Sequence, residues 1–215
     1  MSLVPWSYSK LKAFETCPKQ FYHMKILKQY PQEETEAMRE EHIRDNKPIP
    51  KKYSYVQPSL DALKRKKGKK LCEYELGLTE DLQPCGFWDE DVWFRGIADL
   101  IILNEEDGIA WVVDYKTGKS ARYADKGQLE LMALAVFKHF PQIEVVRGSL
   151  LFVVCKQLIT ESYTRPRREN DLEVKYRDKF SQMVIASDNN VWNPNPSGLC
   201  RAWCDVLECA HNGRS

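Results

Sequence analysis

The segment that most constrains this chain is an apolar run, Ile109-Ala110-Trp111-Val112-Val113, which leads into Asp114-Tyr115-Lys116. The run is short and is followed by Thr117-Gly118, which predicts a buried strand that ends in a turn. Residues two apart on a strand face the same side, so Asp114 and Lys116 project together and Tyr115 points away. Both charged groups need partners, because burying an unpaired charge is costly.

A partner for this pair ends a second strand-like run, Phe94-Arg95-Gly96-Ile97-Ala98-Asp99. The connection Asn104-Glu105-Glu106-Asp107-Gly108 is typical of a tight hairpin. If Leu103 pairs with Ala110, the antiparallel ladder places Asp99 opposite Asp114, and opposite residues share a face. A slip of one residue would separate them. In this register the hairpin predicts one patch that contains Asp99, Asp114 and Lys116.

Such a patch has the composition of a metal site. Two aspartates, a backbone carbonyl and waters form an oxygen-rich shell that suits Mg²⁺ or Mn²⁺, and Tyr115 is the candidate for the carbonyl. A metal ion there would polarise a phosphoryl oxygen, and Lys116 would orient a water or stabilise charge on a phosphate. The residues therefore indicate phosphodiester hydrolysis with one or two ions. The alternative is a surface salt bridge at a strand end.

The rest of the chain predicts one mixed α/β domain. With 215 residues, of which 43% are hydrophobic, the chain can bury a substantial core. The order of helix, three strands, helix and one or two strands indicates a mixed central sheet flanked by helices. Hydrophobic patterns predict strands at 71–78, 91–103, 109–116, 148–155 and 157–163, and helices at 7–27, 33–45, 125–140 and 169–186.

Prolines and serines refine these elements. Ser7 or Ser9 is expected to cap the first helix, and Pro18 to break or kink it after Cys17. Three further prolines are expected to mark a loop, namely Pro48, Pro50 and Pro58.

Charge and cysteine usage narrow the class of protein. The formal net charge of +1 does not advertise a polyanionic partner, although residues 64–70 form a dense cationic run. No stretch has the apolar length of a signal peptide core or a membrane span, so we expect a soluble intracellular protein. The seven cysteines do not fit a secreted disulfide framework. We expect Cys72, Cys85 and Cys155 to be inert packing residues.

Several separated segments, in order, resemble one family. Residues 7–18 resemble an S-x-S-x-L-x-x-F-x-x-C-P helix, residues 95–99 an R-G-x-x-D strand, and residues 113–118 a D-x-K-T-G strand. Gln128 resembles the glutamine that opens the next helix, and Cys200, Cys204 and Cys209 resemble a C-terminal cysteine cluster. Together they resemble the RecB-like branch of the PD-(D/E)XK nuclease superfamily, and most closely its short phage-type exonucleases.

The resemblance implies roles for the patch residues. Asp99 and Asp114 would bind Mg²⁺ or Mn²⁺, Lys116 would be the catalytic lysine, and Gln128 would contact the site or the DNA. Glu73 resembles the acidic residue of the first strand, with Glu75 as its competitor on the same strand face.

Two positions depart from the family pattern. Met132 occupies the place of a tyrosine that usually follows the glutamine by four residues. His42 has no preceding glycine of the family's G-x-x-x-H type motif, so we do not identify it firmly with the family histidine.

The cysteine cluster has three interpretations. In the family, one N-terminal and three C-terminal cysteines hold a 4Fe–4S cluster, which would make Cys17, Cys200, Cys204 and Cys209 its ligands. A zinc site is the competitor, with His211 as an alternative ligand. The third interpretation is unligated thiols. The resemblance thus implies a single nuclease domain over residues 1–215, with segments 1–30 and 192–215 as a cysteine-stapled appendage.

Phosphate contacts are expected at two places. The cationic run supplies Lys64, Arg65, Lys66 and Lys67, although a solvated loop is the alternative. The start of the first helix supplies Ser7, Ser9 and Lys10. We also expect Arg95 to contact DNA and Phe14 to lie in the core.

The predicted function is a metal-dependent exonuclease that hydrolyses DNA at duplex or single-strand ends in recombination, repair or phage DNA metabolism. The alternatives are an endonuclease, resolvase or CRISPR-adaptation-type nuclease on the same fold, or an inactive DNA-binding scaffold. A single-strand-annealing recombinase is the expected protein partner, and the cytoplasm of a bacterial or phage-infected cell the expected location.

Overall fold

The computed structural model of the chain describes residues 5–30, 57–122 and 124–214. The chain divides into two compact units. Unit 1 comprises Met1–Glu33 and Lys175–Ser215, and unit 2 comprises Glu34–Val174. The segments 1–30 and 192–215, in which the expected staple lies, both belong to unit 1.

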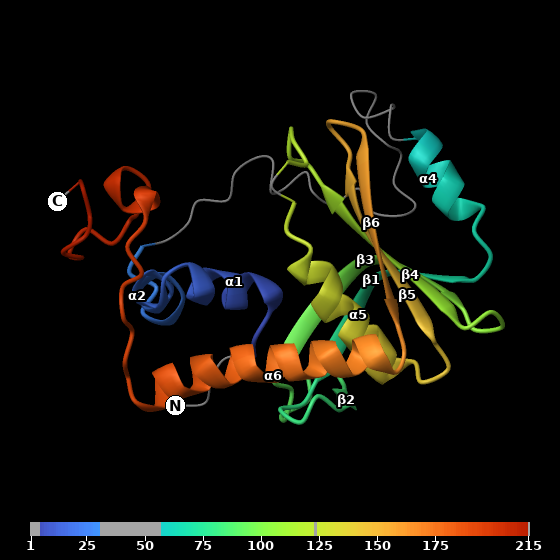
Figure 1. Ribbon diagram of the computed structural model, residues 1–215, viewed down its shortest axis with the longest axis horizontal. Helices are drawn as coiled ribbons and strands as arrows, with labels where there is room; N and C mark the ends of the chain where they lie inside the picture. The colour runs from blue at the N-terminus through green and yellow to red at the C-terminus, as the bar shows by residue number, and fades with distance from the viewer. Residues whose placement is uncertain (1–4, 31–56, 123, 215) are drawn as a thin grey trace. The chain divides into compact units, whose positions relative to one another are not determined.

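Unit 2 is built on a mixed six-stranded sheet with the order β2-β1-β3-β4-β5-β6 (Figure 1). Neighbouring strands are antiparallel except for β4 and β5, which are parallel. This confirms the predicted fold class. The strands are β1 (Lys69–Leu78), β2 (Pro84–Cys85), β3 (Phe94–Asn104), β4 (Ile109–Lys116), β5 (Val145–Phe152) and β6 (Gln157–Thr164).

The register of the β3–β4 hairpin is the one predicted from the sequence. Leu103 pairs with Ala110, and Leu100 with Val113. Asn104 closes the turn by donating from its side-chain amide to Asp107 at 2.6 Å, and Gly108 adopts a φ of +65° that favours glycine.

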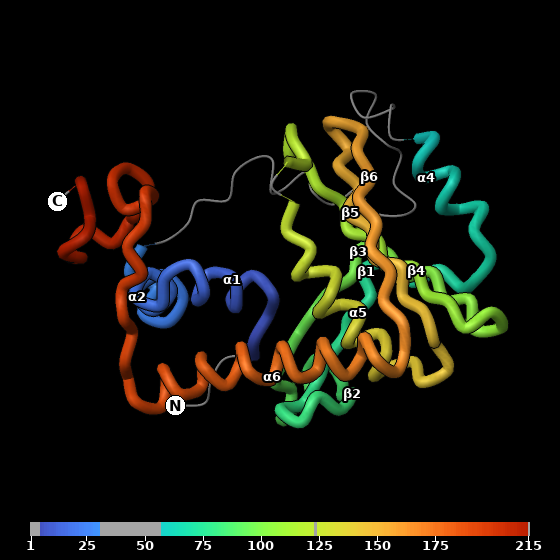
Figure 2. Tube along the Cα trace, in the orientation of Figure 1, coloured from blue at the N-terminus to red at the C-terminus, as the bar shows by residue number. Residues whose placement is uncertain are grey.

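Helix α5 (Gly127–His139) connects the parallel strands β4 and β5 and is buried on almost every side, as its continuous apolar sequence predicts. It packs close to the sheet where Gly148 lies in β5, because a Cβ there would come within 3.1 Å of Leu129 Cβ. Figure 2 shows α5 crossing the twisted β3–β4 and β5–β6 hairpins, with the first turns of α6 (Arg167–Asp188) beside it. Lys138 of α5 pairs with Glu169 and Glu173 of α6 at 3.3 and 2.7 Å.

The opposite face of the sheet is covered by α4 (Gln57–Lys64). Leu60 and Leu63 pack against a buried cluster that includes Leu100 and Val113. The expectation that Pro58 marks a loop is wrong. Proline is tolerated in the first turn of a helix, where its missing N–H has no intrahelical acceptor, and Pro58 occupies that turn.

Unit 1 begins with two short helices that meet at Cys17. Helix α1 (Tyr8–Thr16) is capped by Ser7, whose Oγ accepts from the Lys10 backbone N–H at 3.4 Å, and α2 (Pro18–Phe21) starts at Pro18. The predicted cap and the predicted break are therefore confirmed. A π-helical turn, η1 (Tyr22–Ile26), follows, and a 3₁₀ turn, η3 (Gly198–Arg201), lies in the C-terminal tail.

The core of unit 1 is aromatic. Phe14 and Phe21 are buried and meet edge to face, and both contact the ring of Trp192. Phe14 is therefore a core residue, as predicted. Trp6 packs on Phe21. This cluster ties α1 and α2 to the segment that follows α6, so that the two ends of the chain share one core.

Three predictions fall on residues 31–56, outside the described part of the chain: the helix at 33–45, His42, and the loop at Pro48 and Pro50. Within the described part, no helix combines the length and the apolarity that a bilayer span requires.

Candidate active site and cysteine cluster

The candidate active site forms where the pairing of β1 with β3 is interrupted. Cys72 pairs with Leu100 and Tyr74 with Ala98, but Glu73 and Asp99, which lie between these pairs, are not themselves paired. Glu73 has a φ of +49°, in the left-handed region that costs a non-glycine residue about 1–3 kcal/mol. A strained residue of this kind persists only when its surroundings hold it in place, and such residues cluster at functional sites.

The side-chain alternation of β3 changes across this interruption. Gly96 faces α5, because a Cβ there would lie 3.0 Å from Met132 Cε. Leu100, an even number of residues away, packs instead in the cluster covered by α4 on the other face. Residues at even spacing normally share a face, so the strand changes sides between these two positions. Asp99 lies within that change of side.

Met132 packs against β3 near this change of side. Its side chain is only 6% exposed, and it fills the space over Gly96. The residue at this position therefore packs in the core and has little surface to offer to a ligand.

The β3–β4 ladder also ends at the site. Its last pair is Leu100 with Val113, whereas the pairing of β4 with β5 continues to Lys116. Asp99 Oδ2 accepts a hydrogen bond of 2.7 Å from the Tyr115 backbone N–H, beyond the end of the ladder. The Asp99 carboxylate therefore connects β3 to β4 just beyond their last paired residues, next to Asp114.

Asp114, Lys116 and Gln128 form a closed network. Asp114 is 9% exposed, and its Oδ2 lies 2.7 Å from Lys116 Nζ. Gln128 Nε2 donates to Asp114 Oδ1 at 2.6 Å, and Gln128 Oε1 accepts from Lys116 Nζ at 2.9 Å. The opposite orientation of the amide would set its NH₂ against the ammonium and its oxygen against the carboxylate, so the two charges fix it. Tyr115 points to the other face, where it packs against the α4-side cluster.

Burial and the neighbouring carboxylates raise the proton affinity of Asp99. Burial, followed by the charge of Asp114 and, more weakly, of Glu73, raises the pKa of Asp99 to about 6, although the Tyr115 N–H and Lys116 oppose the shift. Glu73 is thus electrostatically coupled to Asp99, while Glu75, its competitor, is exposed. The structure brings Glu73 into the site with Asp99, Asp114, Lys116 and Gln128.

This donor set fits a divalent cation. Asp99 is poorly solvated, and burial together with the negative charges of Asp114 and Glu73 favours its protonated form, which a cation would reverse. Oxygen ligands of this kind suit Mg²⁺ or Mn²⁺. Asp99 and Asp114, with Glu73 beside them, are the side chains that could hold the ion.

The four cysteines predicted to act together lie around one small cavity in unit 1. Cys17, Cys200, Cys204 and Cys209 line it together with His211. Cys17 Sγ accepts from the backbone N–H groups of Gln20 at 3.5 Å and of Asn195 at 3.4 Å, and Cys200 Sγ accepts from the Ser197 N–H at 3.4 Å. None of the four forms a disulfide. Backbone N–H groups directed at sulfur stabilise thiolates and tune metal centres.

The charge and spacing of the sulfurs constrain what they could hold. Burial, followed by the other three cysteines, raises the pKa of Cys204, so deprotonating all four requires a compensating cation. Among the residues that the structure describes, no three of these sulfurs lie within 4.8 Å of one another. Tetrahedral zinc with Zn–S bonds of about 2.3 Å needs sulfurs only about 3.8 Å apart. The observed spacing is wider than a closed zinc site.

The four residues of the cationic run that were predicted to contact DNA differ in their exposure and in their contacts with other side chains. Lys66 Nζ lies 3.5 Å from the ring centroid of Trp111, and Lys67 pairs with Glu106 at 2.5 Å, whereas Lys64 and Arg65 are exposed. Half of this set is thus already engaged within unit 2.

At the start of α1, the three predicted contacts take part in local structure. The Ser7 hydroxyl bonds that of Ser9 at 3.0 Å, and Lys10 Nζ donates to the Pro5 carbonyl at 2.8 Å.

Arg95 lies in an arrangement that the sequence did not reveal. Its guanidinium is 5.2 Å from the ring centroid of Phe87 and 4.8 Å from that of Trp88, which is 73% exposed. The only available signal was the pair of adjacent aromatics after β2, a two-residue strand too short to be recognised from its sequence.

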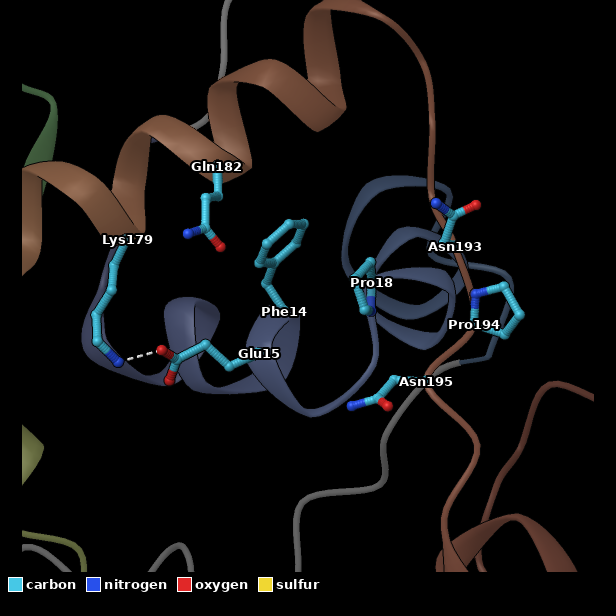
Figure 3. Close-up of a pocket in the computed structure, with 8 residues that line it drawn as sticks. All are labelled: Phe14, Glu15, Pro18, Lys179, Gln182, Asn193, Pro194 and Asn195. Atoms are coloured by element: carbon cyan, nitrogen blue, oxygen red, sulfur yellow. Dashed lines mark hydrogen bonds and ion pairs between the residues drawn. The ribbon is translucent and has the colours of Figure 1, made fainter.

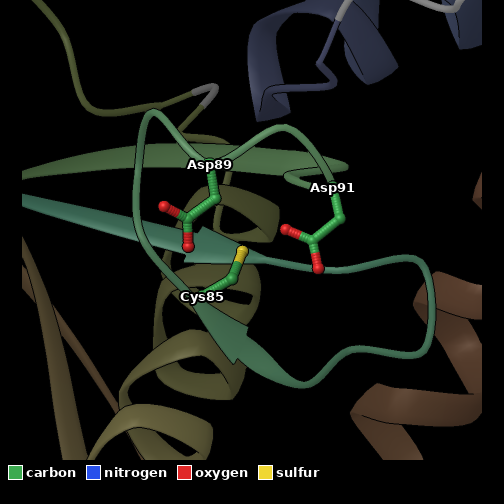
Figure 4. A group of neighbouring side chains, drawn as sticks. All are labelled: Cys85, Asp89 and Asp91. Atoms are coloured by element: carbon green, nitrogen blue, oxygen red, sulfur yellow. The ribbon is translucent and has the colours of Figure 1, made fainter.

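The same loop carries a further group of metal-ligating side chains, Cys85, Asp89 and Asp91, whose ligand atoms lie within 4.8 Å of one another (Figure 4). Asp89 Oδ2 accepts from the Gly86 N–H at 2.6 Å and so closes the turn. Burial and the two carboxylates raise the pKa of the Cys85 thiol, although Arg95 opposes them. The group therefore acts as a turn with a protonated thiol.

The chain is similar to solved structures at low sequence identity. Among curated proteins, none matches the chain. The chain is similar to the crystal structure of SSO0001, with a TM-score of 0.45 and 13% identity over 98% of this chain and 90% of that one. It is also similar to a candidate exonuclease from Eubacterium rectale, with a TM-score of 0.52 and 10% identity over 91% of this chain and 85% of that one.

A family model covers most of the chain. The model of the PD-(D/E)XK nuclease superfamily matches residues 52–209, which include β1, β3, β4 and α5 with the five residues predicted to be catalytic. The chain therefore belongs to the PD-(D/E)XK nuclease superfamily.

Proposed function

We propose that the protein is a metal-dependent deoxyribonuclease that hydrolyses phosphodiester bonds at DNA ends. The observation that carries the proposal is the gathering of Asp99, Asp114 and Lys116, with Glu73 and Gln128, at the point where β3 separates from its neighbours. These are the residue types that metal-assisted phosphodiester hydrolysis requires. The superfamily to which the chain belongs is a family of nucleases.

Each side chain has a distinct task in this proposal. Asp99 and Asp114, with Glu73 and the Tyr115 carbonyl as further candidates, would hold Mg²⁺ or Mn²⁺, which would supply Lewis acidity and lower the pKa of a bound water. Gln128 fixes the carboxylate of Asp114 and the ammonium of Lys116 in one orientation. Lys116 stabilises negative charge on the phosphate or positions the attacking water. Because the Lys116 ammonium is already held in position, it can stabilise this charge without reorganising during the reaction.

Action at DNA ends is supported by the structural neighbour from Eubacterium rectale, which is named as a candidate exonuclease. The proposal therefore favours an exonuclease over an endonuclease or resolvase. Recombination, repair or phage DNA metabolism is the proposed setting, and a single-strand-annealing recombinase the proposed partner.

The experiment compares linear and closed circular duplex DNA, each with Mg²⁺, with Mn²⁺ and with EDTA. We expect linear DNA to be degraded from its ends, circular DNA to be spared, and EDTA to stop degradation. Efficient cutting of circles would replace the exonuclease with an endonuclease. Binding of DNA without cleavage under every metal condition would identify an inactive scaffold.

For the cysteine cluster we propose a 4Fe–4S centre held by Cys17, Cys200, Cys204 and Cys209. Its support is the single cavity that the four cysteines line and the N–H donors at Cys17 and Cys200. Protein purified without oxygen should be brown, with absorbance near roughly 400 nm. A colourless protein that contains stoichiometric zinc would overturn this assignment in favour of a Cys–His zinc site that uses His211.

A further inference from the structure

Unit 1 contains a pocket of about 360 Å³ that none of the proposed catalytic residues lines. Its volume falls within the range of about 300–1,000 Å³ that is usual for small-ligand sites. Figure 3 shows its walls. Helix α1 and the start of α2, the later turns of α6, and the extended segment after α6 contribute Phe14, Glu15, Pro18, Lys179, Gln182, Asn193, Pro194 and Asn195.

The pocket combines a fixed aromatic ring with amides. Phe14 is 8% exposed, and its ring is held edge-on by Phe21 and Trp192, so it cannot rotate away. Gln182 extends from α6 toward this ring, while Asn193 and Asn195 lie on the far wall (Figure 3). An apolar wall beside side-chain amides suits a nucleobase, because the wall excludes water from the base and an amide offers both a donor and an acceptor to the base edge.

A cation completes the edge of the pocket. Lys179 pairs with Glu15 there, and both side chains are about one-third exposed. The described residues of unit 1 contain ten lysines and arginines against five aspartates and glutamates, a formal charge of +5, although the whole chain carries only +1. Positive charge is thus concentrated in unit 1, although the net charge of the whole chain is small. A concentration of this kind attracts a polyanion.

The far wall of the pocket is attached to the cysteine cluster. Asn195 donates from its backbone N–H to Cys17 Sγ at 3.4 Å and from its side chain to the Thr16 carbonyl at 3.1 Å. The Asn193 carbonyl accepts from the Lys19 N–H at 3.3 Å. The segment that lines the pocket on one side therefore lines the cysteine cavity on the other, and a metal centre at the cysteines would hold this wall in place.

We propose that this pocket binds one unpaired nucleotide of a DNA strand. Its base occupies the space lined by Phe14 and Pro18, the amides of Gln182 and Asn193 bond the base edge, and Lys179 exchanges Glu15 for the phosphate. The inference rests on the proposed function only in taking DNA as the substrate. It adds a subsite for single-stranded DNA in unit 1, separate from the carboxylate site of unit 2.

The test uses two lysines on the same helix. Lys179→Gln and Lys175→Gln each remove one positive charge from α6, but only Lys179 lines the pocket. Gln182→Leu removes an exposed amide at nearly constant size. Each is placed in the full chain with Asp114→Ala, so that the DNA is not consumed. Fluorescence anisotropy then measures the Kd for a single-stranded oligonucleotide and for a blunt duplex of the same length.

We expect Lys179→Gln to weaken single-strand binding about fivefold more than Lys175→Gln does, and Gln182→Leu to weaken it roughly tenfold. Blunt duplex binding should change equally for the two lysine variants. Equal effects of the two lysines on the single strand, or no effect of Gln182→Leu, would overturn the proposed subsite.

The outcome is separable from that of the proposed nuclease function. If the unmodified protein degrades linear DNA but the variants bind single strands equally, the subsite alone fails. If the protein cleaves no DNA but the variants still differ, the nuclease proposal fails and the nucleotide subsite stands.

Discussion

The carboxylate site and the cysteine cluster are both candidate metal centres, but the chain assembles them differently. The carboxylate site draws on residues 73–128, which run from β1 through consecutive strands to the start of α5. The cysteine cluster joins Cys17 to a group at residues 200–209, from opposite ends of the sequence. Sheet register therefore positions the first set of ligands, whereas closure of the whole chain positions the second.

The two sites also differ in which groups compensate the charge of their ligands without a bound ion. At the carboxylate site, Lys116 and Gln128 already compensate Asp114 through hydrogen bonds and an ion pair. At the cysteine cluster, the described contacts to sulfur come from backbone N–H groups, and burial together with the other three sulfurs raises the pKa of Cys204. Loss of the ion should thus abolish activity at the first site and stability at the second. Four predictions test this division.

The largest effect is expected from Asp114→Ala. This change removes a proposed metal ligand and the acceptor for both Lys116 and Gln128, so DNA cleavage should fall by roughly a thousandfold or more. Asp91→Ala is the matched control, because Asp91 is an exposed aspartate of the Cys85 group. Cleavage of linear DNA measures the loss, and thermal unfolding checks the fold. Full activity of Asp114→Ala would remove the carboxylate site from the mechanism.

Cys204→Ser should act mainly on stability. Loss of a thiolate ligand releases the metal centre, and the energy of a structural metal is folding energy, so Tm should fall by about 10 °C together with the visible absorbance. Cys155→Ser is the control, since Cys155 is also half-buried but lies in unit 2. Equal shifts in Tm for the two variants would mean that the cluster holds no structural ion.

Metal binding at the carboxylate site should depend on pH. The pKa of Asp99 is raised from 3.8 to about 6, so an ion that binds the ionised carboxylate must displace a proton below that pH. Affinity for Mn²⁺, measured by titration calorimetry, should fall about tenfold per unit as the pH drops below about 6, and level off above it. In the metal-free protein the sign is opposite: the folded state retains the proton more tightly, so Asp99 makes stability decrease as pH rises from 3.8 to about 6.

The smallest effect, and the one that separates two acidic residues, is expected from Glu73→Gln. Removing this charge lowers the pKa of Asp99 and should stabilise the metal-free protein by up to about 1 kcal/mol while weakening metal-dependent cleavage. Glu75→Gln should change neither, because Glu75 is exposed. Denaturant unfolding and Mg²⁺ titration of activity measure the two quantities. A stronger effect of Glu75→Gln on cleavage would reverse the assignment.

Local patterns predicted much of unit 2 because its strands pair with their sequence neighbours. The apolar run that ends at Asp114 and the tight connection after Asn104 were enough to predict the register that the structure shows. The wrong prediction of a loop at Pro58 also came from a local pattern. Proline is compatible with both a loop and the first turn of a helix, and only the packing of Leu60 and Leu63 selects the helix.

Other features depend on contacts that no local pattern carries. The left-handed conformation of Glu73 occurs in an ordinary strand sequence, and the position of Arg95 over Phe87 and Trp88 depends on a loop that folds back beside β3. The nucleotide pocket requires α1, α6 and the tail to meet, so its residues are scattered from 14 to 195.

The sequence by itself determined the strand that ends in Asp114-Tyr115-Lys116, its hairpin partner, and the residue types needed to bind a divalent ion. These follow from alternation, turn chemistry and the cost of burying charge, which act over a few residues. Only the tertiary structure decided how Gln128 bridges Asp114 and Lys116 and that Glu73 couples to Asp99, and it brings Cys17 into one cavity with the three C-terminal cysteines. Those contacts depend on how a helix packs on the sheet and on how the chain ends meet, and both are settled by the packing of the whole core.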